Sequence, residues 1–229
     1  VLSLDPPQSG DLDLPQALDR AGFAPDLVLE RENLGRSFFL NGLDEVGCPA
    51  VFWSLDTHLN HFWQRRTAPL YDLVLTTQPS FVQALGRAGA PRAACLPWFS
   101  RPRPFVPWAQ RSTQAAFVGR LSEQRPARTA MVRLLEERHG LKLFSDVTTA
   151  RMAEIYAAAR LVPNETIAGE VNLRIFEAAA CGCLPLSPAQ AADQEEFFEP
   201  GREFLPFADV LELLDLMRWA GNNQAQAEQ

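Results

Sequence analysis

Three polar side chains stand close together at the start of one apolar helical pattern. In "EVNLRIFEAAACGCLPLS", residues 170–187, Asn172, Leu173 and Arg174 open the pattern and Glu177 follows one turn later. The first backbone N–H groups of a helix have no partner within it and, with the helix dipole, favour an anion. Arg174 adds a guanidinium fork suited to phosphate, where a purely structural helix usually carries Asp or Glu. These residues are therefore predicted to bind an anionic ligand.

Glu177 adds a carboxylate to the same helix. It can accept hydrogen bonds from a diol such as that of a ribose. The alternative is an ordinary ion pair between Arg174 and Glu177, three residues apart on a solvated helix face. This segment alone leaves both interpretations open.

A second basic stretch, "FVGRLSEQR", covers residues 117–125. Gly119 ends a predicted strand and allows close backbone approach, and Arg120 and Arg125 lie in the following loop or first helical turn. Two guanidiniums near one edge of a sheet indicate a diphosphate. A solvated loop that happens to be basic is the alternative.

A third polar group lies in "SLDTHLNHFW", residues 54–63. Asp56 and His58 are two apart, so an extended backbone would place them on the same side, and His61 follows closely. His58 can accept or donate a proton, which makes Asp56 and His58 candidate catalytic residues. Structural hydrogen bonding is the alternative. The Asp-x-His-x-x-His spacing also suits zinc, but the sequence offers no fourth ligand, and no metal site is predicted.

Short apolar runs that alternate with helical patterns must position these residues. Such alternation predicts an α/β fold with parallel sheets, and ligands bind such sheets where the strands end. The predicted strands cover residues 26–30, 49–56, 71–77, 114–119, 141–146, 159–164 and 183–187. The firmest helices follow within residues 125–140, 148–160 and 170–182, with His139-Gly140 as one stop and Thr148 or Thr149 as one cap. Residues 221–229 are expected to be a frayed tail.

Four prolines, Pro97, Pro102, Pro104 and Pro107, exclude a helix or central strand between the two halves of the chain. We therefore predict two lobes, residues 1–108 and 109–229. The chain begins with Val1 rather than Met, as a fragment or a processed chain would.

Composition narrows the class of protein. The chain has 229 residues with 21 Lys and Arg against 28 Asp and Glu, and this net charge of −7 argues against a nucleic-acid partner. No apolar stretch reaches the length of a membrane span. The four cysteines form no Cys-x-x-Cys pair, which favours reduced thiols and a cytoplasmic protein.

Together the two basic stretches resemble the nucleotide-sugar-binding lobe of two-lobed (GT-B) glycosyltransferases. The closest resemblance is to the spore-maturation CgeB-like branch, which is related to the retaining glycosyltransferase group 1 family. "NLRIFEAAACGCLPLS" is similar to that branch's Asn-x-Arg-x-Phe-Glu-Ala…Ala-Cys-Gly pattern. "FWSLDTHLNHFWQRRTAPLYDLVLTTQPSFV" resembles its first-lobe strand ending in Asp and the strand after it. The resemblance covers residues from about 45 to about 215.

The broader family assigns roles to matching positions. A Gly-Arg-Leu segment with a basic residue five positions after the Arg grips the donor diphosphate, and Arg120 and Arg125 match it. Two glutamates with seven residues between them follow, the second binding the ribose, and Glu177 matches that one. Gly169 occupies the first position and Glu170 is one residue late, so a contact of Glu170 with the sugar is not implied. The first lobe's usual glycine-rich loop and the long C-terminal helix are not visible.

The resemblance implies two Rossmann-like lobes, possibly compact or truncated relative to the family. Residues 1–108 would face the acceptor, and residues 109–229 would bind the nucleotide sugar. The implied activity is metal-independent transfer of a sugar, as by a hexosyltransferase, from a nucleotide-diphosphate donor to an acceptor hydroxyl. No cofactor is needed, and the acceptor can be a glycan, a protein or a small molecule. A non-catalytic nucleotide-sugar-binding or scaffolding module and a nucleotide-sugar epimerase remain as alternatives. An oxidoreductase is disfavoured because no Gly-x-Gly-x-x-Gly follows a predicted strand.

Overall fold

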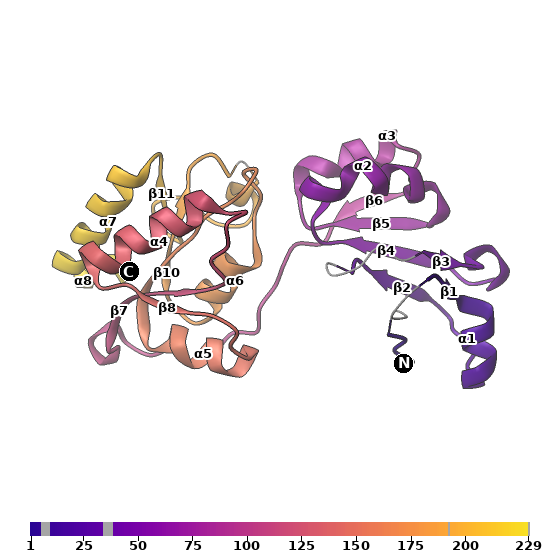
Figure 1. Ribbon diagram of the computed structural model, residues 1–229, viewed down its shortest axis with the longest axis horizontal. Coiled ribbons are helices and arrows are strands. Elements are labelled where there is room, and N and C mark those ends of the chain that lie inside the picture. The colour runs from indigo at the N-terminus through magenta and orange to yellow at the C-terminus, as the bar shows by residue number, and fades with distance from the viewer. Residues whose placement is uncertain (6–9, 34–38, 192, 229) are drawn as a thin grey trace. The chain divides into compact units, whose positions relative to one another are not determined.

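The computed structural model describes residues 1–5, 10–33, 39–191 and 193–228. Within them the chain forms two compact units, Val1–Pro97 and Trp98–Gln229, each with its own parallel β-sheet (Figure 1). This confirms the predicted α/β class with parallel sheets. No helix in these residues is long and apolar enough to cross a membrane.

The division between the units falls earlier in the chain than the predicted division at residue 108. The proline-rich segment belongs to the second unit, because the backbone N–H of Arg103 donates to Ala180 O at 2.8 Å. Trp108 is only 2% exposed and lies in the core of the second unit. The prolines exclude regular structure there, as expected, but the segment is packed against its own unit.

The first unit is built on the sheet order β2-β4-β5-β6. Its strands are β2 (Val28–Arg31), β4 (Ala50–Ser54), β5 (Leu73–Thr76) and β6 (Ala93–Cys95), and a separate pair joins β1 (Leu12–Asp13) to β3 (Leu40–Asn41). The helices are α1 (Leu14–Ala21), α2 (Thr57–Thr67) and α3 (Val82–Arg87). Helices α2 and α3 lie on the same side of the four-stranded sheet (Figure 1). Phe52 and Val74 bury their side chains with Leu85 of α3.

The second unit has the sheet order β11-β10-β9-β7-β8. Its strands are β7 (Thr113–Val118), β8 (Lys142–Phe144), β9 (Ala159–Pro163), β10 (Leu184–Pro188) and β11 (Leu205–Phe207). The helices are α4 (Pro126–His139), α5 (Thr149–Ala157), α6 (Leu173–Ala180), α7 (Val210–Asn222) and α8 (Gln224–Ala227). From β7 the chain moves outward to β8 and then crosses back to β9 on the other side of β7. The strand order therefore reverses between β7 and β9.

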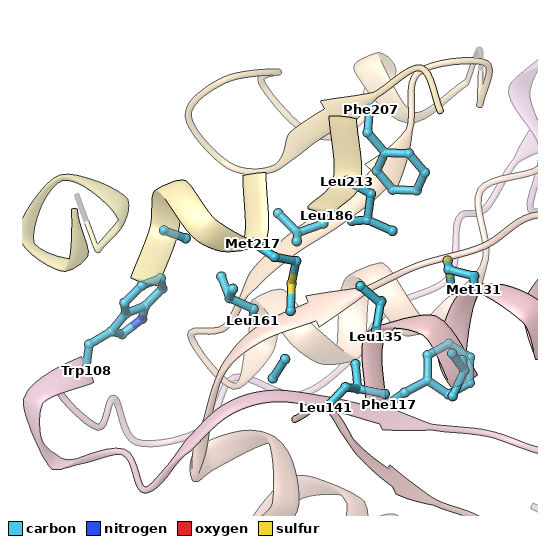
Figure 2. Packing of buried hydrophobic residues seen from close by; sticks show 13 residues of the cluster. Trp108, Phe117, Met131, Leu135, Leu141, Leu161, Leu186, Phe207, Leu213 and Met217 are labelled. Carbon is cyan, nitrogen blue, oxygen red and sulfur yellow. The ribbon is translucent and has the colours of Figure 1, made fainter. Parts of the chain in front are cut away.

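Strand β7 divides the core of the second unit into two layers, because alternate side chains point to opposite faces. Phe117 lies in the layer with Leu135 of α4 and Met217 of α7, as Figure 2 shows. Ala116 lies in the other layer, with Tyr156 of α5. Helices thus cover both faces of this sheet, and their N-termini meet its carboxyl edge.

The helix boundaries test the predicted start and stop signals. Thr148 caps α5 by accepting the N–H of Arg151 at 3.2 Å, and Gly140 ends α4 with a φ of 62°. Both signals are confirmed. The expected frayed tail is wrong for residues 224–227, which form α8, and the next residue, Glu228, accepts the backbone N–H of Trp108 at 2.7 Å. This contact anchors the end of the chain to the second unit.

Candidate anion-binding site

The site of interest lies at the carboxyl ends of β7 and β9. The chain leaves these neighbouring strands toward opposite sides, and open α/β sheets bind ligands in the crevice that such a reversal creates. Gly119, Arg120 and Arg125 follow β7, whereas Asn172 and Arg174 follow β9. The topology therefore brings the two predicted basic stretches to one edge of one sheet.

Arg174 joins the two strands. Its Nε and Nη2 donate to Val118 O at 3.4 and 3.3 Å, and its Nη1 donates to Asn164 Oδ1 at 3.0 Å. Its guanidinium carbon lies 4.1 Å from the centroid of the Phe117 ring, which is a cation–π contact. Asn164 in turn donates to Ser187 Oγ at 3.1 Å. The charge is therefore held in one position before any ligand arrives.

Gly119 leaves the space that the Arg174 guanidinium occupies. A Cβ built at position 119 would lie 2.9 Å from Arg174 Nη2 and 3.0 Å from Phe117 Cε1. The sequence predicted close backbone approach at this glycine. In the structure the approaching group is the side chain of Arg174.

Arg128 of α4 lies beside the same Phe117 ring as Arg174, although neither of the two predicted basic stretches includes it. It is 7% exposed, its Nε donates to Glu165 Oε2 at 2.7 Å, and its guanidinium carbon lies 5.8 Å from the Phe117 centroid. Two guanidiniums thus share one aromatic ring. A signal existed, because Arg128 follows Arg125 by three residues in a predicted helix and so shares its face.

Neighbouring charges act on Arg174. Burial lowers the pKa of its guanidinium; the nearby Tyr156 hydroxyl opposes this, the Arg128 charge adds to the lowering, and Glu177 and Glu165 also oppose it. Because arginine titrates far above neutral pH, the group stays charged. The site therefore contains two fixed positive charges.

The start of α6 is set by Asn172. The helix begins at Leu173, within the predicted segment 170–182, and Asn172 Oδ1 accepts the N–H of Arg174 at 3.2 Å. Asn172 Nδ2 donates to Glu165 O at 3.0 Å. The Asn172 side chain, predicted to bind substrate, is thus engaged as a helix cap that also fixes the preceding loop.

Glu177 is partly buried on α6, and its carboxylate accepts no hydrogen bond from any residue that the structure describes. Burial raises the pKa of its carboxyl, and Arg174 opposes that rise. The two side chains form no ion pair in the described chain, so the structural alternative of an Arg174–Glu177 pair is not what the fold contains. The carboxylate remains available to a ligand.

Arg120 and Arg125 are placed differently from Arg174. The Arg120 side chain is 81% exposed, and its Nη2 lies 2.6 Å from Asp146 Oδ1. Arg125 precedes α4 and, within the residues described, makes no ion pair. Of the three predicted arginines, Arg174 alone rests on Phe117.

The loop between β9 and α6 explains why this chain has Gly169 at the position of the first glutamate in the two-glutamate pattern. Gly169 has a φ of +78°, and a Cβ there would lie 2.9 Å from Gln190 O, so a glutamate does not fit. Glu170 is 7% exposed, and its carboxylate accepts the backbone N–H groups of Ile167 and Ala168 at 3.0 and 2.9 Å. It holds the loop closed.

The first unit gathers polar groups at the ends of β2, β4 and β5. The expected extended backbone across Asp56 and His58 is wrong, because β4 ends at Ser54 and α2 begins at Thr57. His58 therefore lies in the first turn of a helix. Among the residues described, no three His, Cys, Asp or Glu side chains are grouped to hold a metal ion.

Glu32, which the sequence analysis did not single out, fixes that turn. It is 3% exposed, and its Oε2 accepts the backbone N–H groups of Leu55 and Asp56 at 2.6 and 2.8 Å. Its Oε1 accepts Asn60 Nδ2 and Gln64 Nε2 at 2.7 and 2.8 Å. The backbone at the start of α2 is thereby held by one buried carboxylate.

Solved structures that share this fold include the GT-B proteins HepE, GtfA and TarM. HepE from Anabaena, solved in complex with UDP, aligns with a TM-score of 0.58 at 15% identity, over 93% of this chain and 73% of HepE. The pneumococcal O-GlcNAc transferase GtfA, solved with UDP and GlcNAc, aligns at 0.60 and 11%, over 93% of this chain and 54% of GtfA. TarM aligns at 0.62 and 10%, over 93% of this chain and 51% of TarM. The chain thus spans about three quarters of HepE and about half of the other two.

The sequence itself matches a family profile described as glycosyl transferase-like, over residues 106–229. This is more than half of the chain, and it includes all of α4, α6 and the strands between them. The chain belongs to this glycosyl transferase-like family. No curated protein sequence matches the chain.

Proposed function

We propose that this protein transfers a sugar from a nucleotide-diphosphate donor to an acceptor hydroxyl without a metal ion, as a member of the CgeB-like branch. The observation that carries the proposal is Arg174, fixed on the Phe117 ring beside Gly119 where the strand order reverses. Membership of the glycosyl transferase-like family supports it. The four cysteines form no disulfide, which fits a cytosolic location.

The chemistry asks for fixed positive charge. Breaking the anomeric C–O bond leaves negative charge on the departing diphosphate, and preorganised cations stabilise that charge without reorganising. Arg174 supplies such a cation because Val118 O and Asn164 already hold it. Arg125 adds a second. Arg120 contributes after exchanging Asp146 for a phosphate oxygen.

The nucleotide and acceptor ends require other groups. Glu177 accepts hydrogen bonds from the ribose hydroxyls, and the start of α6, at Asn172 and Leu173, faces the phosphates. Asp56 and His58 are proposed to exchange protons with the acceptor hydroxyl. Support for them comes from Glu32, which fixes the backbone that carries them.

A second function is favoured by one observation. Because Gly169 leaves no room for the family's first glutamate and Glu170 closes its own loop, the protein could hold a nucleotide sugar without turning it over. Such a module would use the same arginines. Only measurements of turnover separate the two.

Ligand binding and turnover test the proposal in sequence. A thermal-shift panel of UDP, GDP, dTDP and CMP, with their sugars, should raise the unfolding temperature for one base, since a ligand of the folded state stabilises by mass action. Arg174→Gln should abolish that shift. Arg138→Gln, which removes the same charge from an exposed position on α4, should leave the shift unchanged. No shift with any nucleotide would refute the site.

The products then identify the reaction. A transferase consumes the donor and adds its sugar to an acceptor. An epimerase yields a free epimerised sugar nucleotide without any acceptor. A binding module leaves the donor intact with every acceptor tried.

A further inference from the structure

Arg128 is a buried cation whose hydrogen-bonding capacity is mostly unused. Only 7% of the residue is exposed. The one hydrogen bond that its side chain makes to a described residue runs from Nε to Glu165 Oε2 at 2.7 Å. Nη1 and Nη2, which carry four N–H groups, donate to no residue in the described chain. These two nitrogens are not among the fully buried side-chain atoms that lack a partner in the described chain, so they reach its surface, where a ligand can meet them.

The surroundings of Arg128 favour an anion. It shares the Phe117 ring with Arg174, and the two like charges are close enough for Arg128 to lower the pKa of Arg174. The Glu165 carboxylate accepts a hydrogen bond from Arg128 Nε, and the backbone carbonyl of Glu165 accepts one from Asn172 Nδ2. In Arg174, by contrast, each of the three guanidinium nitrogens already donates a hydrogen bond to a protein oxygen. Arg128 therefore has the larger number of N–H groups available to a ligand at this edge.

We propose that Arg128 binds the diphosphate of the nucleotide donor through Nη1 and Nη2, while Glu165 holds Nε. This inference rests on the proposed function. The carboxylate fixes the plane of the guanidinium, so its terminal fork meets two phosphate oxygens with little loss of side-chain entropy. Glu165 is then a positioning residue for Arg128, and not a ligand.

The competing explanation is that the Arg128–Glu165 pair only ties α4 to the loop after β9. The double variant Arg128→Gln/Glu165→Gln separates the two. It keeps the net charge of the protein, its side chains are close in size to the originals, and Gln can hydrogen-bond to Gln. A purely structural tie would largely survive in it, whereas a phosphate-binding guanidinium would be gone.

The experiment is calorimetric titration of the wild type and the variants with UDP, GDP, dTDP and inorganic pyrophosphate. Arg128→Gln and the double variant should weaken the diphosphate that binds the wild type by about tenfold or more, as expected for loss of charged hydrogen bonds. Glu165→Gln should bind at least as tightly as the wild type, since a negative charge near the phosphates is removed. Arg138→Gln, at the far end of α4, should change nothing.

Two outcomes would overturn the inference alone. One is a double variant that binds like the wild type; the other is Glu165→Gln, which keeps an oxygen that can accept Nε, weakening binding by about tenfold or more relative to the wild type. The second decides the question even if the Arg128 variants do not fold, which thermal melts would reveal. A wild-type protein that binds none of the four probes would instead overturn the proposed function, and this inference with it.

Discussion

The guanidinium of Arg174 occupies the space that a side chain at position 119 would fill. A Cβ on Gly119 would lie 2.9 Å from Arg174 Nη2. The glycine directly follows β7 and the arginine is the second residue of α6, so the relationship joins two segments that lie more than fifty residues apart. The position of Arg174 therefore requires a residue without a Cβ at position 119.

Gly119→Ala should therefore displace Arg174 from Phe117. The added methyl group meets a guanidinium and a ring edge, and overpacking of this kind typically costs about 1–3 kcal/mol of unfolding free energy. Since the displaced charge no longer faces the ligand, we expect nucleoside diphosphate binding to weaken by about tenfold, comparable to losing one charged hydrogen bond. Urea unfolding and calorimetry measure the two effects.

Gly221→Ala is the matched control for that substitution. Gly221 lies within α7, and its nearest neighbour would be Gln114 Nε2 at 3.5 Å, an ordinary contact. Alanine in a helix is favoured over glycine by about 0.5–1 kcal/mol, so this variant should be as stable as the wild type or more so. Equal binding losses in both variants would contradict the role given to Gly119.

Glu177→Gln should stabilise the free protein in a pH-dependent way. Burial raises the folded-state pKa of this carboxyl above its unfolded value, so its contribution to stability is present below the unfolded pKa, about 4.3, and is lost as pH rises through the folded pKa. The neutral amide avoids that loss. The variant should therefore gain unfolding free energy relative to the wild type as the pH is raised above about 4.3, measured by urea denaturation over a series of pH values.

The same substitution should weaken nucleotide binding if Glu177 meets the ribose. A nucleoside diphosphate should lose affinity, whereas inorganic pyrophosphate, which has no ribose, should bind unchanged. Glu137→Gln, at an exposed position of α4, is the control for both measurements. Loss of pyrophosphate binding would place Glu177 elsewhere in the site.

Much of the central fold could be predicted from the sequence because its strands carry strong local signals. The runs at β4, β7 and β9 are apolar and bounded by polar residues, and the structure places strands within all three predicted segments or at one residue from them. The strands that were missed, β1, β3, β6 and β11, have only two or three residues each. Strand β6 is Ala-Ala-Cys and β11 has Pro206 at its centre, so both are also weak in β-propensity. These segments form strands because they hydrogen-bond to neighbouring strands, and not because of their local sequence.

The site was predictable only where chemistry and spacing coincide within one segment. Gly119 and Arg174 stood out because each opens a turn or helix at the end of a strand. Arg128 and Glu165 did not, since their partnership depends on the crossing of the chain between β7 and β9. Glu32 was hidden for a similar reason, because its contacts with Leu55 and Asp56 depend on the pairing of β2 with β4. Asp56 could have been recognised as a helix N-cap instead of a strand residue, because Asp commonly precedes a helix.

The cysteines should differ widely in reactivity. Burial raises the pKa of the Cys183 thiol to about 12, and its Sγ donates to Tyr156 O at 3.0 Å. Because the thiolate is the reactive form, Cys183 should resist iodoacetamide at pH 8 in the native protein, as should buried Cys181. The partly exposed Cys48 and Cys95 should be alkylated first, which peptide mass spectrometry can follow. Early labelling of Cys183 would contradict its buried environment.

Arg111 should matter for stability and not for binding. It is 2% exposed, and its guanidinium donates to four backbone carbonyls, those of Val106 at 2.7 Å, Tyr156 at 3.4 Å, Ala159 at 2.6 Å and Cys181 at 3.0 Å. Arg111→Met leaves these acceptors without a charged donor, each such bond contributing about 1.5–3 kcal/mol, so unfolding free energy should fall by about 3 kcal/mol or more.

Arg133→Met is the control for Arg111, since it breaks an exposed ion pair with Glu136 worth about 0.3–0.5 kcal/mol. Below the unfolding transition, Arg111→Met should bind a nucleoside diphosphate as the wild type does, because its acceptor Ala159 begins β9, whereas the site lies at the carboxyl ends of β7 and β9. A selective loss of binding, with stability unchanged, would mean that the second unit has an anion site at Arg111. The cations around Phe117 would then be structural, joining α4 and α6 to the sheet.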